Sequence, residues 1–363
     1  MLKELFENTN ALLIGIDIGS YAVKAVLLEK VEEDIRVLHC ATESMPKSAM
    51  NERDLQDIEA VGKVLSRLRK KFPKQHKKVA IAVSGSTVIT KTVYMDVNFN
   101  DEELATQIEI EADSLIPYPI EEVSIDFERL ETNASDPSKV NVLLSAARTE
   151  SVEARVSACD LAGLQAKVVD VETYALARAL QLCHYQLPDD YQDKVVGVID
   201  LGAQITLMCA IKNGQVLFTR DQTFGGDIYT KNIISFYNKS YEEAELAKLT
   251  SDLPPNYEYE VLAPFQTSVI QQVRRSVQIF TTSTAEDRID YLILSGGTAV
   301  VEGLKEVIED ELGIHCVVAH PLGKLDFTTA DMSAHERKKY TAESASFMIA
   351  CGLAMRSFNA CHI

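Results

Sequence analysis

Two short segments of this 363-residue chain place an aspartate two positions before a glycine, between two apolar runs. The first is Asp17-Ile18-Gly19 within residues 12–28, and the second is Asp200-Leu201-Gly202 within residues 195–211. Glycine lets a turn approach a ligand closely, and the N–H groups of such a turn can point at an anion. An aspartate at a strand end can hold the water shell of Mg²⁺. Two such turns predict a metal-chelated polyphosphate that is gripped from both sides.

Lys24 strengthens this interpretation, because it follows Asp17 by seven residues on the expected second strand. From there its ammonium can reach back toward the β- and γ-phosphates. Two commoner nucleotide motifs, G-x-G-x-x-G and G-x-x-x-x-G-K-[ST] opening a helix, do not occur. One D-x-G turn alone is a weak signal, since any hairpin can contain it, and the strength of the prediction comes from having two copies.

The elements around both turns repeat along the chain. Residues 12–28 and 195–211 each alternate an apolar strand, a turn and a second apolar strand, and Asn213-Gly214 then turns into a third strand at 215–220. An internal duplication explains this economically. It predicts two similar α/β halves that face each other across a cleft.

Two further patterns concern the other end of a nucleotide. A strand at 291–295 runs through Gly296-Gly297 into an amphipathic helix, where a flat base can lie against the backbone. A tight strand-to-helix turn is the plainer alternative. Glu245 and Lys248 share a helical face within 241–249, either as a surface ion pair or as a grip on ribose hydroxyls.

The charge distribution separates one region from the rest. The chain carries a net charge of -18 and a pI near 4.9, which argues against a general nucleic-acid binder. Residues 96–136 hold thirteen acidic residues and one basic residue, Arg129. This shift predicts an inserted subdomain, with a solvated acidic face as the alternative. Within it, Asn100 and Glu103 form a capping-box pattern that opens a helix ending before Pro117.

Other local patterns complete the outline. Apolar residues at helical spacing predict an amphipathic helix over 51–78, with Leu55, Ile58, Val61, Leu65 and Leu68 on one face. The seven cysteines are scattered without a C-x-x-C pair, so neither a zinc site nor a disulfide framework is indicated. No run of about 18 apolar residues occurs, so we expect a cytoplasmic protein without direct membrane insertion.

Taken together, these motifs resemble the actin-like ATPase superfamily, and within it the PilM family of type IV pilus assembly, with FtsA a more distant relative. The resemblance covers nearly the whole chain. It rests on the segments 14–26 and 198–227 (phosphate motifs), 168–180 and 344–358 (connecting helices), 292–304 (adenosine motif) and 111–130 (the insert).

The resemblance implies an α/β fold, namely a duplicated actin-like (ribonuclease H-like) two-lobed fold with an FtsA-type inserted subdomain. The implied division places 1–83 and 165–185 in the first lobe and 84–164 in the insert. Residues 186–363 form the second lobe, whose C-terminal connecting helix returns to the first.

The resemblance also implies ATP and Mg²⁺ as ligands, with Asp17 and Asp200 approaching Mg²⁺ through water. The other implied contacts are Gly19, Ser20, Tyr21 and Lys24 on the phosphates from one side, Gly202, Ala203 and Gln204 from the other, Glu245 and Lys248 on the ribose, and Gly296, Gly297 and Thr298 around the adenine. Glu172 occupies the position of a residue that orients the attacking water, or it merely favours the start of its helix through the helix dipole.

Both phosphate turns depart from the superfamily pattern. Tyr21 is bulky for a phosphate loop, and the second turn carries Ala203-Gln204 where small residues are usual. Their side chains must point away from the nucleotide or narrow the site. Because a misplaced water costs orders of magnitude in rate while ground-state contacts survive, we expect nucleotide binding with slow or no hydrolysis.

The family implies partners as well. We expect the cytoplasmic N-terminal tail of a PilN-like inner-membrane protein to lie in a groove beside the insert, which would bring the chain to the inner face of the membrane. Contacts with other pilus assembly components are implied, and self-association is left open. The alternatives are a small-molecule (sugar or acid) kinase of the superfamily, for which no catalytic base stands out, and a protein-binding module that has lost its nucleotide.

Overall fold

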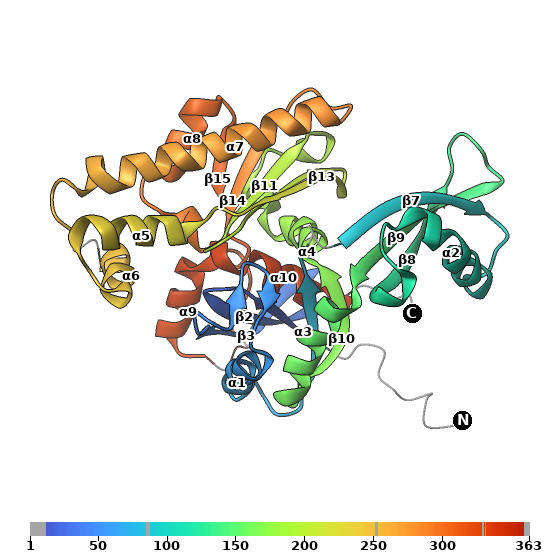
Figure 1. Cartoon of the computed structure of the whole chain (residues 1–363), viewed down its shortest axis with the longest axis horizontal. Helices are drawn as coiled ribbons and strands as arrows, with labels where there is room; N and C mark the ends of the chain where they lie inside the picture. Colours follow the sequence, from blue (N-terminus) through green and yellow to red (C-terminus); the bar gives the residue numbers. More distant parts are fainter. Residues whose placement is uncertain (1–11, 85–87, 251–252, 329, 331, 359–363) are drawn as a thin grey trace.

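The first half of the molecule is built on a five-stranded sheet of order β10-β6-β1-β2-β3 (Figure 1). The computed structural model describes residues 12–84, 88–250, 253–328, 330 and 332–358. β1 to β3 form an antiparallel meander, and β6 and β10 extend the sheet in parallel from β1. The strands are β1 (Ile14–Ile18), β2 (Ala22–Val31), β3 (Asp34–Ser44), β6 (Lys78–Val83) and β10 (Gln165–Val171).

A second five-stranded sheet repeats this topology, with the order β13-β12-β11-β14-β15. β11 to β13 are again antiparallel, and β14 and β15 again run parallel to the first strand. The strands are β11 (Val196–Leu201), β12 (Thr206–Lys212), β13 (Gln215–Gln222), β14 (Tyr291–Ser295) and β15 (His315–Val318). The duplicated two-lobed α/β fold predicted from the sequence is therefore confirmed.

Helices cover the outer face of each sheet and leave the inner faces toward each other. α1 (Ile58–Arg69) and α3 (Thr149–Leu161) cover the first sheet over one apolar core. The second sheet is covered by α5 (Gly226–Tyr237), α7 (Ala263–Ser283) and α8 (Leu304–Leu312), with α6 (Tyr241–Thr250) against α5, and α9 (Ala334–Ala342) lies beside the first sheet (Figure 1).

A smaller antiparallel sheet of order β7-β9-β8 projects to one side of the first sheet, at the right of Figure 1. It comprises β7 (Val88–Asp96), β8 (Val123–Thr132), β9 (Lys139–Arg148) and α2 (Asp101–Leu115), and it buries a core of its own. The predicted capping box is confirmed: the Asn100 side chain accepts from the Glu103 N–H, and the Glu103 carboxylate accepts from the Asn100 N–H. The exact limits of the lobes and the insert stay a prediction.

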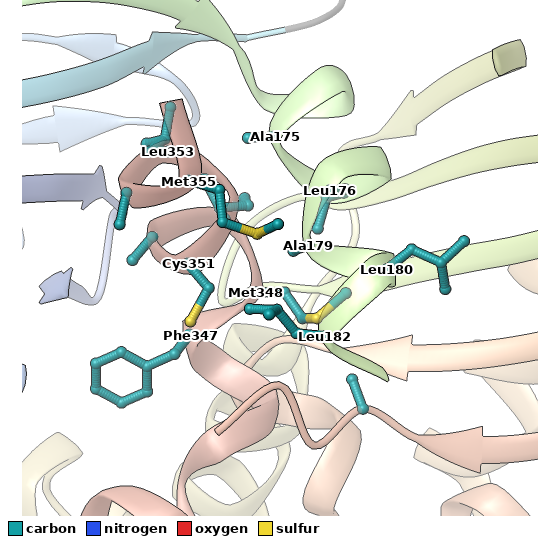
Figure 2. Packing of buried hydrophobic residues seen from close by; sticks show 14 of the residues in the cluster. Ala175, Leu176, Ala179, Leu180, Leu182, Phe347, Met348, Cys351, Leu353 and Met355 are labelled. Carbon is teal, nitrogen blue, oxygen red and sulfur yellow. The ribbon is translucent and has the colours of Figure 1, made fainter. Parts of the chain in front are cut away.

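Two helices fill the space between the inner faces of the large sheets. α4 (Glu172–Ala179) continues as a 3₁₀ helix over Leu180–Gln186, and α10 (Met348–Ala354) lies between 3₁₀ turns at Ser344–Phe347 and Met355–Phe358. Figure 2 shows Leu176 and Ala179 of α4 on the side of that helix where Met348 and Met355 lie, and Leu180 and Cys351 belong to the same apolar cluster. The same apolar cluster includes side chains from both sheets, so it joins the lobes.

The backbone of α10 approaches its neighbours where glycines leave room. A Cβ at Gly15 in β1 would lie 2.1 Å from the Ala350 carbonyl oxygen. A Cβ at Gly352 in α10 would lie 1.8 Å from the Ala175 carbonyl oxygen in α4. Neither position can hold a side chain without moving a backbone, so glycine is required at both.

The predicted helix over 51–78 is wrong at both ends. A two-stranded hairpin, β4 (Met50–Asn51) and β5 (Asp54–Leu55), replaces its first part. The helix begins only after Asp57, whose side chain accepts from the Ala60 N–H at 2.9 Å. It ends at Arg69, because the turn at Lys70 precedes Phe72-Pro73 and proline cannot continue a helix.

None of the helices in the described part of the chain combines the length and the apolar character needed to cross a bilayer.

Six cysteines are buried as free thiols, and Cys361 lies outside the described residues. The Gly296-Gly297 pair does not open α8 directly. Gly297 begins a 3₁₀ turn that ends at Val300, and α8 begins only at Leu304.

We predict that Gly352→Ala lowers the free energy of unfolding by about 3 kcal/mol or more, because its methyl group meets a carbonyl oxygen of α4. Gly297→Ala is the matched control, since a methyl group there meets no atom within 4 Å and the backbone φ lies outside the left-handed region. Urea denaturation of both variants measures the difference, and an equal effect would contradict the assigned constraint.

Candidate functional site

A cavity of about 390 Å³ lies between the two lobes, where the turns after β1 and β11 face each other. Every residue that the sequence singled out as a site residue lines it: Asp17, Gly19, Ser20, Tyr21, Lys24, Glu172, Asp200, Gly202, Ala203, Gln204, Glu245, Lys248, Gly296, Gly297 and Thr298. The topology explains this gathering, because β1 and β11 occupy equivalent places in the two sheets. The roles of these residues toward a nucleotide stay a prediction.

Asp17 and Lys24 form an ion pair on neighbouring strands. They are register partners in the β1–β2 hairpin, and the Lys24 Nζ lies 3.0 Å from the Asp17 Oδ2. Burial by itself lowers the pKa of Lys24, but the charge and the hydrogen bond of Asp17 outweigh it and leave that pKa above its ordinary value. The ammonium therefore stays charged in the cavity.

Asp200 occupies the equivalent place in the second lobe. Its Oδ1 accepts a hydrogen bond of 2.8 Å from the Ser295 hydroxyl. Burial raises the pKa of Asp200, and the charge of Asp17 raises it further. Two carboxylates that repel each other across a cavity attract a cation between them. Among the described residues, no group of three or more His, Cys, Asp or Glu side chains lies close enough together to hold a metal ion.

The turn after β14 is packed against the turn after β11. Gly296 has a φ of +88°, and a Cβ there would lie 2.4 Å from the Leu201 carbonyl oxygen. The Thr298 hydroxyl donates to the Gly202 carbonyl at 3.1 Å, which ties the two turns together. A Cβ at Gly297 would meet no atom within 4 Å, so this glycine leaves a flat opening on the cavity wall.

Glu245 and Lys248 of α6 line the cavity and form an ion pair with each other. The Lys248 Nζ lies 2.6 Å from the Glu245 Oε1, and it donates to the Thr230 hydroxyl of α5 at 2.7 Å. That hydroxyl, which is fully buried, donates in turn to Glu245. Tyr21 also hydrogen-bonds to Glu245, and burial raises the pKa of the Tyr21 phenol. Tyr21 is thus directed at the second lobe.

The side chain of Gln204 is engaged at both ends. Its Oε1 accepts from the Glu52 N–H of the first lobe at 2.8 Å, and its Nε2 donates to the Asp227 Oδ2 at 3.3 Å. The unusual residue in the second turn therefore bridges the lobes.

Sequence reasoning missed several cavity residues, among them Glu52, Arg53, Arg155, Asp227, Tyr229 and Tyr257. Arg53 is the most consequential, because its Nη1 forms a close ion pair with Glu172 and its Nε lies 3.8 Å from the Asp221 Oδ2. It stands at the tip of the β4–β5 hairpin, in a segment that the sequence pattern predicted to be helical. Recognising the β4–β5 hairpin in the sequence would have identified Arg53 as a residue of the cavity.

Glu172 is the first residue of α4, where an acidic side chain in the first turn interacts favourably with the helix dipole. Its pairing with Arg53 is a second interaction, and both interpretations of Glu172 stay predictions. The Oε2 of Glu172 is buried and makes no hydrogen bond in the described part of the structure, which leaves the ion pair as its main interaction.

A second hollow of about 660 Å³ lies between the small sheet and α4. The small sheet contributes Asp126, Glu128 and Leu143, and α4 contributes Tyr174 and Arg178. At its floor, Asp170 lies 3.0 Å from the Arg178 Nη1 and 3.5 Å from the Arg356 Nε. The hollow therefore combines an acidic wall, an apolar strip and a pair of partly neutralised arginines.

The two lobes, the cleft between them and the small sheet define an actin-like α/β protein. A comparison with solved structures matches the PilM-PilN type IV pilus biogenesis complex with a TM-score of 0.79 at 24% identity, over 96% of this chain and 99% of that chain. Ethanolamine utilization protein EutJ from Carboxydothermus hydrogenoformans matches with a TM-score of 0.55 at 16% identity, over 94% and 89% of the two chains. These likenesses establish the fold.

The family model described as type IV pilus assembly protein PilM matches residues 15–358, and the chain belongs to this family. The cell division protein FtsA of Bacillus subtilis (strain 168) is 22% identical over 333 residues, which cover 84% of this chain and 70% of FtsA. The predicted membership of the PilM family is thereby confirmed.

We predict that Thr230→Val destabilises the fold by about 1–3 kcal/mol, because it leaves the partly buried Glu245 and Lys248 without their shared hydroxyl. Thr267→Val on the exposed face of α7 is the control, since its hydroxyl bonds only a carbonyl four residues earlier. Chemical denaturation compares the two. Losses of equal size would show that the Thr230 hydroxyl does not organise this part of the cavity.

Proposed function

We propose that this protein is an ATP-binding scaffold of type IV pilus assembly, in which the nucleotide acts mainly as a conformational ligand. The observation that carries the proposal is that one cavity between the lobes collects both Asp-x-Gly turns, the Gly296-Gly297 turn and the partly buried cations Lys24, Arg53 and Lys248. Family membership supports the pilus assignment.

The cavity residues fit a Mg²⁺-nucleotide. Lys24 and the N–H groups of the turns at Gly19 and Gly202 suit phosphate oxygens, while Asp17 and Asp200 suit the water shell of Mg²⁺. Bound Mg²⁺ would neutralise phosphate charge. At the other end, the Glu245–Lys248 pair suits ribose hydroxyls, and the open wall at Gly297 suits a flat base.

Slow or absent hydrolysis agrees with the state of Glu172. A residue that orients an attacking water uses a carboxylate oxygen, and one of the two oxygens of Glu172, Oε2, is paired with Arg53. The nucleotide would then hold the lobes together without being turned over rapidly.

The Asp17→Asn variant tests the nucleotide site. We expect it to weaken Mg-ATP binding at least about 100-fold, because it removes a metal-shell carboxylate and the partner of Lys24. Asp34→Asn, at the exposed first residue of β3, should bind as the parent protein does. Isothermal titration with ATP and Mg²⁺ measures both, and unchanged affinity in Asp17→Asn would remove Asp17 from the site.

We further propose that the hollow between the small sheet and α4 binds the cytoplasmic tail of a PilN-like membrane protein. The solved complex that this chain resembles is one of PilM with PilN. An acidic wall at Asp126 and Glu128 suits a peptide with basic flanks, and Leu143 and Tyr174 offer apolar contact. Such binding would bring the protein to the inner face of the membrane through its partner.

The double variant Asp126→Asn, Glu128→Gln tests this groove. We expect a synthetic basic-flanked tail peptide to bind roughly 3- to 10-fold more weakly, with a reduced salt dependence, because exposed charges contribute modestly. Glu102→Gln, Glu109→Gln on exposed positions of α2 is the control with equal charge change.

Fluorescence anisotropy of the labelled peptide measures these affinities. Equal weakening by both double variants would indicate a general charge effect and contradict the groove. The same titration in saturating Mg-ATP measures the coupling between nucleotide and tail, which must be reciprocal. Identical tail affinities with and without Mg-ATP would refute that coupling while leaving the scaffold role intact.

A further inference from the structure

The β4–β5 hairpin reaches from the first lobe into the cleft and carries Arg53 at its tip. Arg155 of α3 supports it from behind, because its Nη2 donates to the Arg53 carbonyl at 2.7 Å. Gln204 of the second lobe holds it from the front through the Glu52 N–H. Glu52 itself adopts a φ of +52°, which lets the tip turn tightly. The guanidinium is therefore placed in the cavity by contacts on both sides.

The surroundings of Arg53 identify the phosphate end of the cavity. Its charge interacts with those of Asp17, Asp200 and Asp221, and it is paired with Glu172. Burial lowers the pKa of Arg53 while these carboxylates oppose that shift, and an arginine so placed remains charged. The Gly296-Gly297 turn and the Glu245–Lys248 pair mark the opposite end.

Arg53 keeps donor capacity that its protein contacts do not use. A guanidinium carries five N–H donors, and Nη1 is the one that meets Glu172. The Nε is buried, lies 3.8 Å from the Asp221 Oδ2, beyond hydrogen-bond distance, and makes no hydrogen bond within the described residues. By contrast, the ammonium of Lys24 is committed to Asp17 at 3.0 Å. A planar guanidinium edge fits two oxygens of one phosphate, a geometry that an ammonium cannot offer.

We propose that Arg53 binds the terminal phosphate of a nucleoside triphosphate, so that the cleft distinguishes the triphosphate from the diphosphate. This inference rests on the proposed nucleotide site. A triphosphate bound with its Mg²⁺ near Asp17 and Asp200 would place its terminal phosphate toward Glu172 and Arg53, and a diphosphate lacks that group. Arg53 retains Glu172 through Nη1 while its remaining edge receives the phosphate.

The contact also reports the nucleotide state to both lobes. The hairpin belongs to the first lobe, whereas Gln204 and Asp221 belong to the second. A phosphate held by Arg53 adds a further link across the cleft at the same hairpin tip. Loss of that phosphate leaves the tip with its protein contacts alone.

The experiment compares Mg-ATP and Mg-ADP binding by isothermal titration to the full chain and to Arg53→Gln, Arg53→Lys and the control Arg36→Gln. We expect the parent protein to prefer ATP at least tenfold. Arg53→Gln should lose at least tenfold in ATP affinity while its ADP affinity changes less than twofold. Arg53→Lys, which keeps the charge but not the planar edge, should fall between them. Arg36, an intermediate-exposure residue of β3 paired with Asp326, should leave both affinities unchanged.

The outcomes separate the two claims. Equal losses for ATP and ADP in Arg53→Gln, or no loss for either, would overturn the assignment of Arg53 while the nucleotide site stands. A parent protein that binds neither nucleotide would overturn the proposed function itself and this inference with it. If Arg53→Gln does not fold, as judged by its thermal unfolding, Arg53→Lys decides: an unreduced preference for ATP would contradict the proposal.

Discussion

The close seating of α10 against β1 and α4 is the constraint on which the rest of the structure depends. At Gly15 and Gly352 there is no room for a side chain between backbones, so α10 is held at a fixed depth between the two sheets. α4 is held with it, and both large lobes contribute side chains to the surrounding apolar cluster. Because α4 begins with Glu172 in the cleft, the packing of these two helices sets the geometry of the site (Figures 1 and 2).

The chain carries a net charge of -18, and the ligand proposed for its cleft is an anion. Three cations line the cavity in ion pairs within the protein: Lys24 with Asp17, Arg53 with Glu172, and Lys248 with Glu245. Such pairs offset the cost of burying the charges before a ligand arrives. α4 also extends from Glu172 to Arg178 in the second hollow, so one short helix contacts both proposed binding regions.

The sequence predicted the fold class and the site residues well because those signals are local or repeated. Strand–turn–strand patterns at both Asp-x-Gly turns became equivalent strands in two sheets, and the capping box at Asn100 appeared as expected. The hairpin at 50–55 was misread because Leu55 shares a helical spacing with Ile58 and Val61. Because of that misassignment, the sequence did not identify Arg53 as a cavity residue. The residues that contact Arg53 are also distant along the chain, as Arg155 shows.

The amino-acid sequence by itself determined the duplicated architecture, the family and the residues that converge on the cleft, since periodicity and glycine turns act over short distances. Only the tertiary structure decided how those residues are paired. The tertiary structure pairs Arg53 with Glu172 and places the Gln204 side chain at the Glu52 N–H. It also forms the hollow between the small sheet and α4. Such contacts depend on how the lobes pack, and packing between segments a hundred residues apart leaves no periodic signature in the chain.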